Sequence, residues 1–212
     1  MKTVIVLLLG LVASPVFAAG LAPIKLPSPQ TDIGRPLMQT LKLRRSERAF
    51  SPRPLPLQEL ANLLWAADGI NRPESGMRTA PSAHNWEEVD IYVVLADGAY
   101  LYDAKANLLA PVAEGDLRGI CGTQGFVKDA PLNLVYVTDL GRVTAKDNDD
   151  TKMVTAVDVG LVVENAYLYC ASQGLAAVVR GSVDRPRLAQ ALKLRPNQRV
   201  MLSHTIGYPA DQ

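Results

Sequence analysis

The sequence "TKMVTAVDVGLVVENAYLYCASQ", residues 151–173, is the longest helical pattern in this chain of 212 residues. Apolar side chains cover most of its circumference, and Gly174 follows at the position where glycine ends many helices. A helix that is apolar nearly all round must be buried on most of its sides. In a domain of this size, the pattern predicts a core helix that also enters an interface between subunits.

Shorter helices and strands are interleaved around this central helix. Apolar spacing predicts helices over residues 36–46, 57–69 and 183–194, the last with Asp184 as its N-cap. Alternating and β-branched residues predict strands over residues 89–96, 98–104, 130–139 and 199–209, whereas residues 107–122 are expected to be helical or irregular. These strands are too few for a full doubly wound sheet. We therefore expect an α+β fold with helices around a small, mainly antiparallel sheet.

The composition limits the class of partner. The chain has 22 Lys and Arg residues against 21 Asp and Glu residues, for a formal charge of +1. Proteins that follow a phosphate backbone are strongly basic on at least one face, so we expect no nucleic-acid partner. A hydrophobic fraction of 48% is enough for a real core and excludes a disordered chain.

The first residues, 1–19, have the layout of a secretory signal peptide. A short charged start precedes an apolar run from Val4 to about Val12, and small residues follow at Ala18 and Ala19. The apolar run is too short for a comfortable membrane span. We expect cleavage, no stable membrane span afterwards, and a periplasmic or secreted mature chain. An uncleaved N-terminal anchor is the alternative.

The remaining chain divides into a tether and one domain. Residues 20–35 are rich in proline, which predicts an extended tether rather than a folded element, and residues 36–212 form the domain. Cys121 and Cys170 are expected to be two separate buried thiols, with a disulfide as the alternative that an oxidising compartment permits. The acidic run "KDNDDTK" lacks the glycine and the final glutamate of a calcium loop, so we expect no metal site.

A cluster of positive charge, "RRSER", occupies residues 44–48. Arginine suits sites where a planar, permanently charged donor must bind phosphate or carboxylate, and Ser46 adds a hydroxyl donor. The same charges also suit the C-terminal end of a helix, where the backbone carries partial negative charge. The spacing alone leaves both interpretations open, an anion site and a solvated basic helix end.

A second polar segment, "TAPSAHNWEE", covers residues 79–88 within a long loop. Pro81 restricts the backbone there, and Ser82 and Asn85 offer hydrogen-bond donors and acceptors. Long ordered loops in compact domains are often functional, so this loop suits the edge of a polar ligand. The alternative is an ordinary turn, in which the same residue types are common.

Taken together, several segments in a fixed order resemble the nitroreductase-like family of flavoproteins. These segments are "RRSERAFSPRPLPLQELANLLWAADGI", "RTAPSAHNWEEVDIYVV", "QGFVKDAPLNLVYVTD", "DVGLVVENAYLYCASQGLAAVVRG" and the terminal "IGYP". Their spacing looks closest to the azoline-oxidising, SagB-type dehydrogenase branch. The resemblance covers residues 37–209.

The resemblance implies an FMN-dependent oxidoreductase, built as a homodimer with FMN at the subunit interface. In such a protein a reduced donor, NADH or NADPH in most of the family, passes a hydride to flavin N5. A small organic acceptor of the nitro, quinone or azoline type then takes the electrons. The flavin carries the chemistry, so no catalytic side chain is assigned. A non-catalytic flavin-binding protein or partner subunit of the same fold is the alternative.

The resemblance also assigns contacts with the cofactor. Arg44 and Ser46, with Arg45 in the same cluster, would hold the FMN phosphate. Arg48 would lie near the pyrimidine end of the ring, where a cation stabilises the charge that develops on reduction. Pro81, Ser82 and Asn85 match the family loop that reaches FMN from the partner subunit. Arg180 and Gly181 would lie where backbone groups pass near the N5 edge of the flavin.

The C-terminal residues depart from the family pattern. Many members carry basic residues after the position of "GYP" that also grip the phosphate, whereas "ADQ" follows here. We therefore expect phosphate binding to rest on Arg44 and Arg48, or on Arg180.

Overall fold

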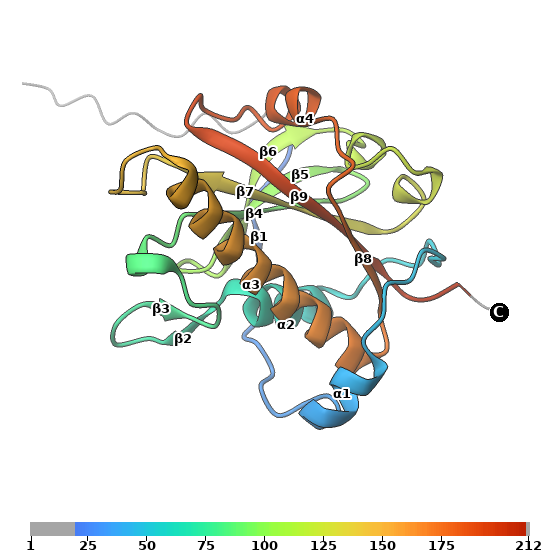
Figure 1. Ribbon diagram of the computed structural model, residues 1–212. Coiled ribbons are helices and arrows are strands. Elements are labelled where there is room, and N and C mark those ends of the chain that lie inside the picture. The colour runs from blue at the N-terminus through green and yellow to red at the C-terminus, as the bar shows by residue number, and fades with distance from the viewer. Residues whose placement is uncertain (1–19, 211–212) are drawn as a thin grey trace, which may run out of the picture.

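A seven-stranded antiparallel sheet forms the centre of the computed structural model, which describes residues 20–210 (Figure 1). Its spatial order is β1-β6-β5-β4-β7-β9-β8. The strands are β1 (Ile24–Lys25), β4 (Val89–Val94), β5 (Gly98–Asp103), β6 (Leu108–Glu114), β7 (Leu132–Asp139), β8 (Ala176–Arg180) and β9 (Gln198–Gly207). The predicted α+β class with a mainly antiparallel sheet is confirmed. The predicted signal peptide lies outside the described residues.

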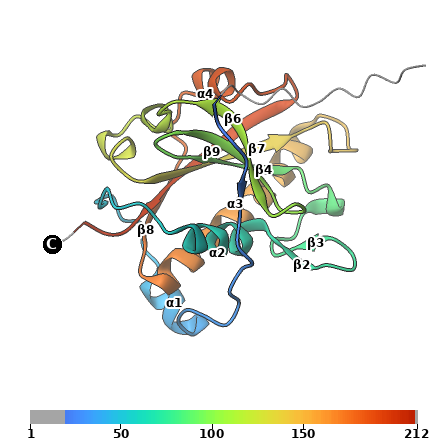
Figure 2. The same ribbon diagram turned by 180° about the vertical axis from the view of Figure 1, so that it is seen from behind.

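The helices lie on both faces of the sheet (Figures 1 and 2). They are α1 (Leu37–Leu43), α2 (Leu57–Asp68), α3 (Asp149–Gln173) and α4 (Arg185–Ala191). Single turns of 3-10 helix occur at η1 (Ala83–Asn85), η2 (Arg118–Ile120) and η3 (Gly125–Val127), and a small hairpin pairs β2 (Ile70–Arg72) with β3 (Met77–Arg78). Asp184 accepts a hydrogen bond from the backbone N–H of Arg187 at 3.1 Å and caps α4 as predicted.

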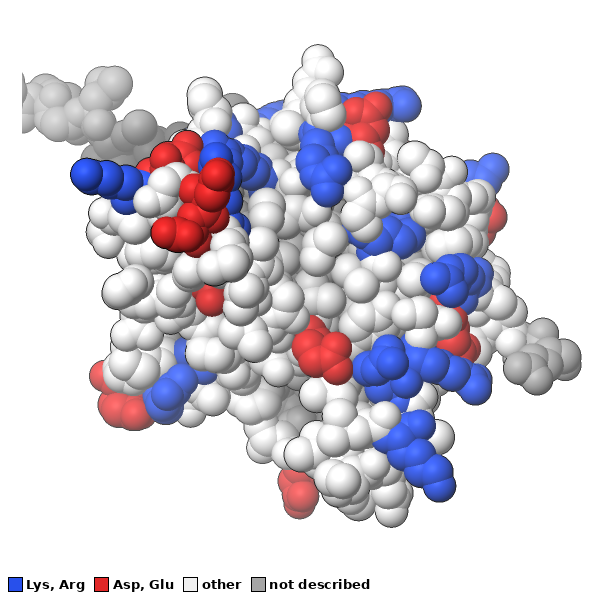
Figure 3. All heavy atoms as spheres, viewed as in Figure 1, with Lys and Arg blue, Asp and Glu red and all other residues white. Residues whose placement is uncertain are grey.

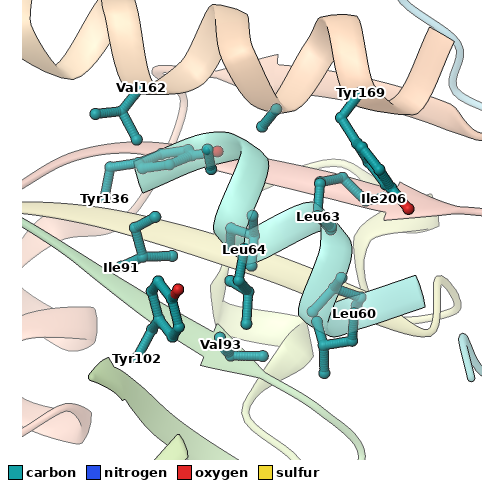
Figure 4. Close-up of a cluster of buried hydrophobic side chains, with 14 of the residues drawn as sticks. Leu60, Leu63, Leu64, Ile91, Val93, Tyr102, Tyr136, Val162, Tyr169 and Ile206 are labelled. Carbon is teal, nitrogen blue, oxygen red and sulfur yellow. The ribbon is translucent and has the colours of Figure 1, made fainter. Parts of the chain in front are cut away.

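Alternation along the strands divides the core into two clusters, one on each face of the sheet. In β4, Ile91 and Val93 pack on the side of α2 and α3, whereas Tyr92 and Val94 pack on the side of α4. Figure 4 shows the larger cluster, in which leucines of α2 fill the space between α3 and the sheet. Because successive side chains of a strand point to opposite faces, a sheet buried on both sides consists of nearly continuous apolar strands.

The long helix α3 is buried along one side and exposed along the other. Its buried side carries residues such as Val159 and Val162, whereas Met153, Val157 and Leu161 are 62%, 56% and 38% exposed. By length and composition alone, α3 could cross a membrane, but it packs along the sheet as the core helix of a folded domain does. The exposed apolar side is available for a second protein surface.

Two predictions from the sequence are wrong at the edge of the sheet formed by β1 and β6. Residues 20–35 are not a free tether, because β1 pairs with β6 and Leu26 is 3% exposed in the core. Residues 108–114 form β6 rather than a helical or irregular stretch. Pro111 argues against a strand because it lacks a backbone donor. It is tolerated here because β1 pairs only with Leu108 and Leu109, so within residues 20–210 most of one edge of β6 bonds to no other strand.

The two cysteines, Cys121 and Cys170, are free and buried, as expected for separate thiols. Burial raises the pKa of the Cys121 thiol to about 12. It also raises the pKa of Cys170. Both side chains are therefore small apolar groups of the core at neutral pH.

The end of α3 depends on a left-handed residue. Gly174 has φ of 74°, and its backbone N–H bonds to the carbonyl of Cys170. We expect Gly174→Ala to lower the free energy of unfolding by about 1 kcal/mol, because a Cβ atom is disfavoured in this conformation. Urea unfolding measures the change. Gly125→Ala is the matched control, because its added methyl group meets open space. Equal destabilisation by the two substitutions would contradict the prediction.

Candidate functional site

The arginine cluster follows α1 as an extended segment. The helix ends at Leu43, and Arg44 has already left the helical conformation, with φ of −56° and ψ of 123°. The backbone N–H of Glu47 donates to the carbonyl of Ala177 in β8 at 2.9 Å. The cluster is therefore attached to the outer edge of the sheet, and only its first residue, Arg44, lies at the helix end as the C-cap of α1.

The extended backbone separates the side chains of the cluster onto two faces. Ser46 Oγ lies 3.0 Å from the hydroxyl of Tyr167, and the Arg44 guanidinium lies 5.5 Å from the centre of the same ring. Arg45 lies on the other face, where it pairs with Glu47 beside a pocket of about 440 Å³. The structure thus brings Arg44 and Ser46 together at Tyr167 and places Arg45 apart. Alternation along an extended segment would put Arg48 on the side of Arg44 and Ser46.

The guanidinium groups of Arg44 and Arg48 form neither a hydrogen bond nor an ion pair with any residue that the structure describes. Arg44 is half-buried and Arg48 is exposed. Two arginines without a carboxylate partner, beside a serine hydroxyl, form a donor set for a doubly charged anion such as a phosphate monoester. Figure 3 shows cations near the α1 end of the molecule and also along the upper part of the view, with few charges in the middle.

The free edge of β8 runs from the arginine cluster toward Arg180 and Gly181. The backbone N–H of Val179 donates to the hydroxyl of Tyr167 at 2.7 Å. Gly181 follows the strand, and its carbonyl accepts from the N–H of Val183 at 3.0 Å. Among the described residues, its own N–H has no partner in a loop or turn hydrogen bond. This N–H can bind an acceptor atom of a ligand laid along the edge.

The side chain of Arg180 is buried and forms hydrogen bonds with groups inside the fold. Its guanidinium donates to the carbonyl of Cys121 at 3.1 Å, to Asn133 Oδ1 at 3.2 Å and to Ser203 Oγ at 3.3 Å, and it also contacts Thr205. Burial lowers its pKa. The expectation that this guanidinium could take over phosphate binding is wrong, because these bonds hold it inside the fold. The backbone groups of Val179 point to the free edge of β8, so those of Arg180 point toward β9, where Arg180 pairs with Ser203.

The predicted loop at residues 79–88 is strained. His84, Asn85 and Glu87 have φ values of 52°, 53° and 47°, a conformation that costs roughly 1 kcal/mol for a residue with a Cβ atom. Asp158 of α3 accepts a hydrogen bond from the N–H of Ala83 at 2.8 Å and so anchors the loop to the helix. Strain that surrounding contacts maintain is typical of functional loops.

Two carboxyl groups near this loop are buried, that of Asp68 at the end of α2 and that of Glu88 at the end of the loop itself. Asp68 forms an ion pair with Arg78 at 2.8 Å, yet burial raises its pKa to about 7. Glu88 is fully buried, and its two carboxyl oxygens form no hydrogen bond with the described residues. Burial raises the pKa of Glu88 to about 7, and the negative charge of nearby Asp158 adds to the shift. At neutral pH the carboxyl groups of Asp68 and Glu88 are therefore partly protonated.

Within one chain, the loop 79–88 and the arginine cluster contact α3 at different positions along the helix axis. The loop is anchored at Asp158 and the arginine cluster at Tyr167, nine residues later on the helix. Nine residues correspond to about 13 Å along a helix axis. A single chain therefore holds the two predicted halves of the site apart, and the exposed apolar side of α3 lies on the same helix.

Sequence reasoning did not single out Asp158 or Tyr167. Both residues interrupt the apolar pattern of the central helix, Asp158 with a charge and Tyr167 with a hydroxyl. A polar group within an otherwise apolar, buried helix needs a partner, and this was the available signal.

Comparison with known proteins gives the family. A model of the nitroreductase family matches residues 41–208. A Methanocaldococcus jannaschii protein named "Putative nitroreductase" is 30% identical over 169 residues, which cover 75% of this chain and 85% of that protein. The crystal structure of a "putative nitroreductase" from Ralstonia eutropha JMP134 is 44% identical, covers 96% of this chain and 97% of that chain, and has a TM-score of 0.86.

A more distant structure carries a ligand. The crystal structure of a "putative nitroreductase in complex with fmn" from Desulfovibrio desulfuricans is 20% identical, with a TM-score of 0.62. The match covers 84% of this chain and 88% of that chain. At this identity the likeness is one of fold.

The buried carboxyl group of Glu88 predicts a dependence of stability on pH. Its pKa of about 7 exceeds the usual 4.5, so the folded state binds the proton more tightly than the unfolded chain does. The free energy of unfolding should therefore fall as pH rises from about 4.5 through about 7. We expect Glu88→Gln to reduce this fall by roughly 1–3 kcal/mol in urea unfolding across that range.

The exposed Glu74 provides the control, because Glu74→Gln should leave the pH dependence of unfolding unchanged. A Glu88→Gln variant with the wild-type pH dependence would show that Glu88 ionises normally in the folded protein.

Proposed function

We propose a function from the premise that this chain belongs to the nitroreductase family, whose model matches residues 41–208. The protein is an FMN-dependent oxidoreductase that passes electrons from a reduced donor to a small organic acceptor. The observation that carries this proposal is the Arg44 guanidinium beside Ser46 at Tyr167, which, like that of Arg48, forms no hydrogen bond or ion pair with the described residues.

The arginine cluster fits the phosphate end of FMN. Arg44 and Ser46 lie together beside Tyr167, and the backbone of Glu47 holds the segment against β8. This attachment fixes the donors before a ligand arrives, which reduces the entropy lost on binding. Arg48 is next on the same face and would lie toward the ring.

The edge of β8 fits the flavin ring. The unbonded N–H of Gly181 is a donor for a ring acceptor, and the buried guanidinium of Arg180 keeps the strand in place. FMN, when bound, supplies the redox chemistry, while the residues of the chain bind, orient and exclude water. Arg48 contributes positive charge that favours a reduced, anionic ring.

A homodimer would complete the site. The exposed apolar side of α3, with Met153, Val157 and Leu161, suits a contact with the same surface of a second copy. In that arrangement the loop with Pro81, Ser82 and Asn85 would reach the cofactor held by the partner. The separation of the loop and the arginine cluster within one chain supports this assignment.

The finer features of the proposal rest on the sequence. The order of its segments supports the SagB-type branch, and the acceptor class is a nitro, quinone or azoline compound. The layout of residues 1–19 supports export to the periplasm or beyond. NADH and NADPH are the family's donors, so an exported member requires a donor available in that compartment. Repeated turnover with a chemical acceptor would separate an enzyme from a flavin-binding partner subunit.

The two faces of the arginine cluster provide a matched test of FMN binding. We expect Arg44→Ala to weaken FMN binding roughly 10- to 100-fold, because it removes a charged donor from the phosphate. Arg45→Ala should leave the dissociation constant nearly unchanged, since Arg45 lies on the other face. Titration of the apoprotein with FMN, followed by flavin fluorescence, measures both. Equal effects would place the phosphate elsewhere.

The dimer contact can be tested on α3. Leu161→Glu places a charge in the middle of the apolar side, so we expect dissociation to monomers in analytical ultracentrifugation and loss of FMN binding. Leu57→Glu is the control, because Leu57 of α2 is similarly exposed, at 42% against 38%. A Leu161→Glu variant that remains dimeric would exclude this side of α3 as the interface.

A further inference from the structure

Tyr167 links the two segments to which the cofactor is assigned. Its hydroxyl accepts the backbone N–H of Val179 at 2.7 Å and lies 3.0 Å from Ser46 Oγ. Ser46 belongs to the arginine cluster, and Val179 precedes Arg180 in β8. One buried hydroxyl therefore joins the phosphate end of the proposed site to the strand at its ring end.

The direction of these hydrogen bonds follows from the donor supply. The N–H of Val179 can only donate, so the Tyr167 oxygen accepts from it. Either hydroxyl could donate across the 3.0 Å contact, but the buried O–H of Tyr167 has no other acceptor among the described residues, so we assign it as the donor to Ser46 Oγ. With its oxygen engaged in this way, Ser46 can direct its own hydroxyl hydrogen outward, where it is exposed. Hydrogen bonds that donate in the same direction along a chain polarise one another, so the last hydroxyl in the chain is a stronger donor to an anion.

Packing holds the ring of Tyr167 in this position. The tyrosine is 5% exposed, and its ring centre lies 4.4 Å from that of His204. His204 is fully buried and lies 3.1 Å from the hydroxyl of Tyr136 through Nδ1. Burial lowers the pKa of His204 to about 3, so the imidazole is neutral and adds no charge beneath the site. The Arg44 guanidinium also lies over the tyrosine ring, 5.5 Å from its centre.

We propose that Tyr167 is a positioning residue for phosphate recognition, whose hydroxyl orients Ser46 toward the phosphate of a flavin mononucleotide. The proposal rests on the proposed function, since it assumes that the cluster binds FMN. It adds a residue that touches neither phosphate nor ring and acts through Ser46. A phenylalanine here would keep the packing with His204 but lose both hydrogen bonds.

The test compares FMN with riboflavin, which has the same ring but no phosphate. We expect Tyr167→Phe to weaken FMN binding roughly 3- to 10-fold and to leave riboflavin binding unchanged. Tyr169→Phe is the matched control, because Tyr169 is also buried in α3 and donates to Glu59 at 2.6 Å, away from the cluster. This control should keep the wild-type ratio of the two dissociation constants.

The outcomes separate this inference from the proposed function. If the wild type binds FMN no better than riboflavin, phosphate recognition fails, and both the proposed site and the role of Tyr167 fail with it. A second outcome is that the wild type prefers FMN while Tyr167→Phe keeps the same preference or weakens the binding of FMN and riboflavin equally. In that case only the role of Tyr167 is overturned. A Ser46→Ala, Tyr167→Phe double variant should bind FMN about as weakly as Ser46→Ala alone, and additive losses would exclude action through Ser46.

A measurement on the wild type covers the case in which Tyr167→Phe fails to fold. Hydrogen exchange at the amide of Val179 reports the strength of its bond to Tyr167. We expect FMN to slow this exchange more than saturating riboflavin does, because the phosphate completes the chain of donors. Equal protection by the two ligands would overturn the proposal.

Discussion

The packing of α3 against one face of the central sheet is the interaction on which the other features depend. Its buried side chains lie among leucines of α2 and apolar residues of the strands, and each contributes roughly 1.5–3 kcal/mol on burial. This burial fixes the orientation of the helix. The same orientation directs Asp158 and Tyr167 toward the loop and the arginine cluster, and leaves one apolar side uncovered.

The exposed edge strand β8 forms part of the proposed cofactor site. An edge strand presents unpaired backbone groups that invite association with other strands. Here the segment with Glu47 covers the carbonyl of Ala177, and Tyr167 takes the N–H of Val179. Both partners come from outside the sheet, and among the described residues the N–H of Gly181, just beyond the strand, has no partner. The site is therefore built from the part of the edge that the fold leaves unpaired.

The sequence predicted the features that depend on local pattern. The central helix, its glycine end and most strands follow from periodicity, and the arginine cluster was recognised from its charge. Strand β6 was missed because Pro111 argues against a strand unless one edge is nearly free, and only tertiary pairing shows that it is. Likewise, Arg180 and Arg44 look equivalent in sequence. The guanidinium of Arg180 is bound by Asn133 and neighbouring groups inside the fold, whereas that of Arg44 lies over the ring of Tyr167 and forms no hydrogen bond or ion pair with the described residues.

The separation of the loop and the arginine cluster along α3 has a thermodynamic consequence for the proposed dimer. If each cofactor contacts both subunits, it binds the dimer more tightly than the monomer, so the ligand must also stabilise the dimer by the same factor. The strain at His84, Asn85 and Glu87 fits this view, because a loop held by Asp158 in an unfavourable conformation is ready to contact a partner's ligand. The buried acids Asp68 and Glu88 would then connect pH, loop anchoring and assembly through α3.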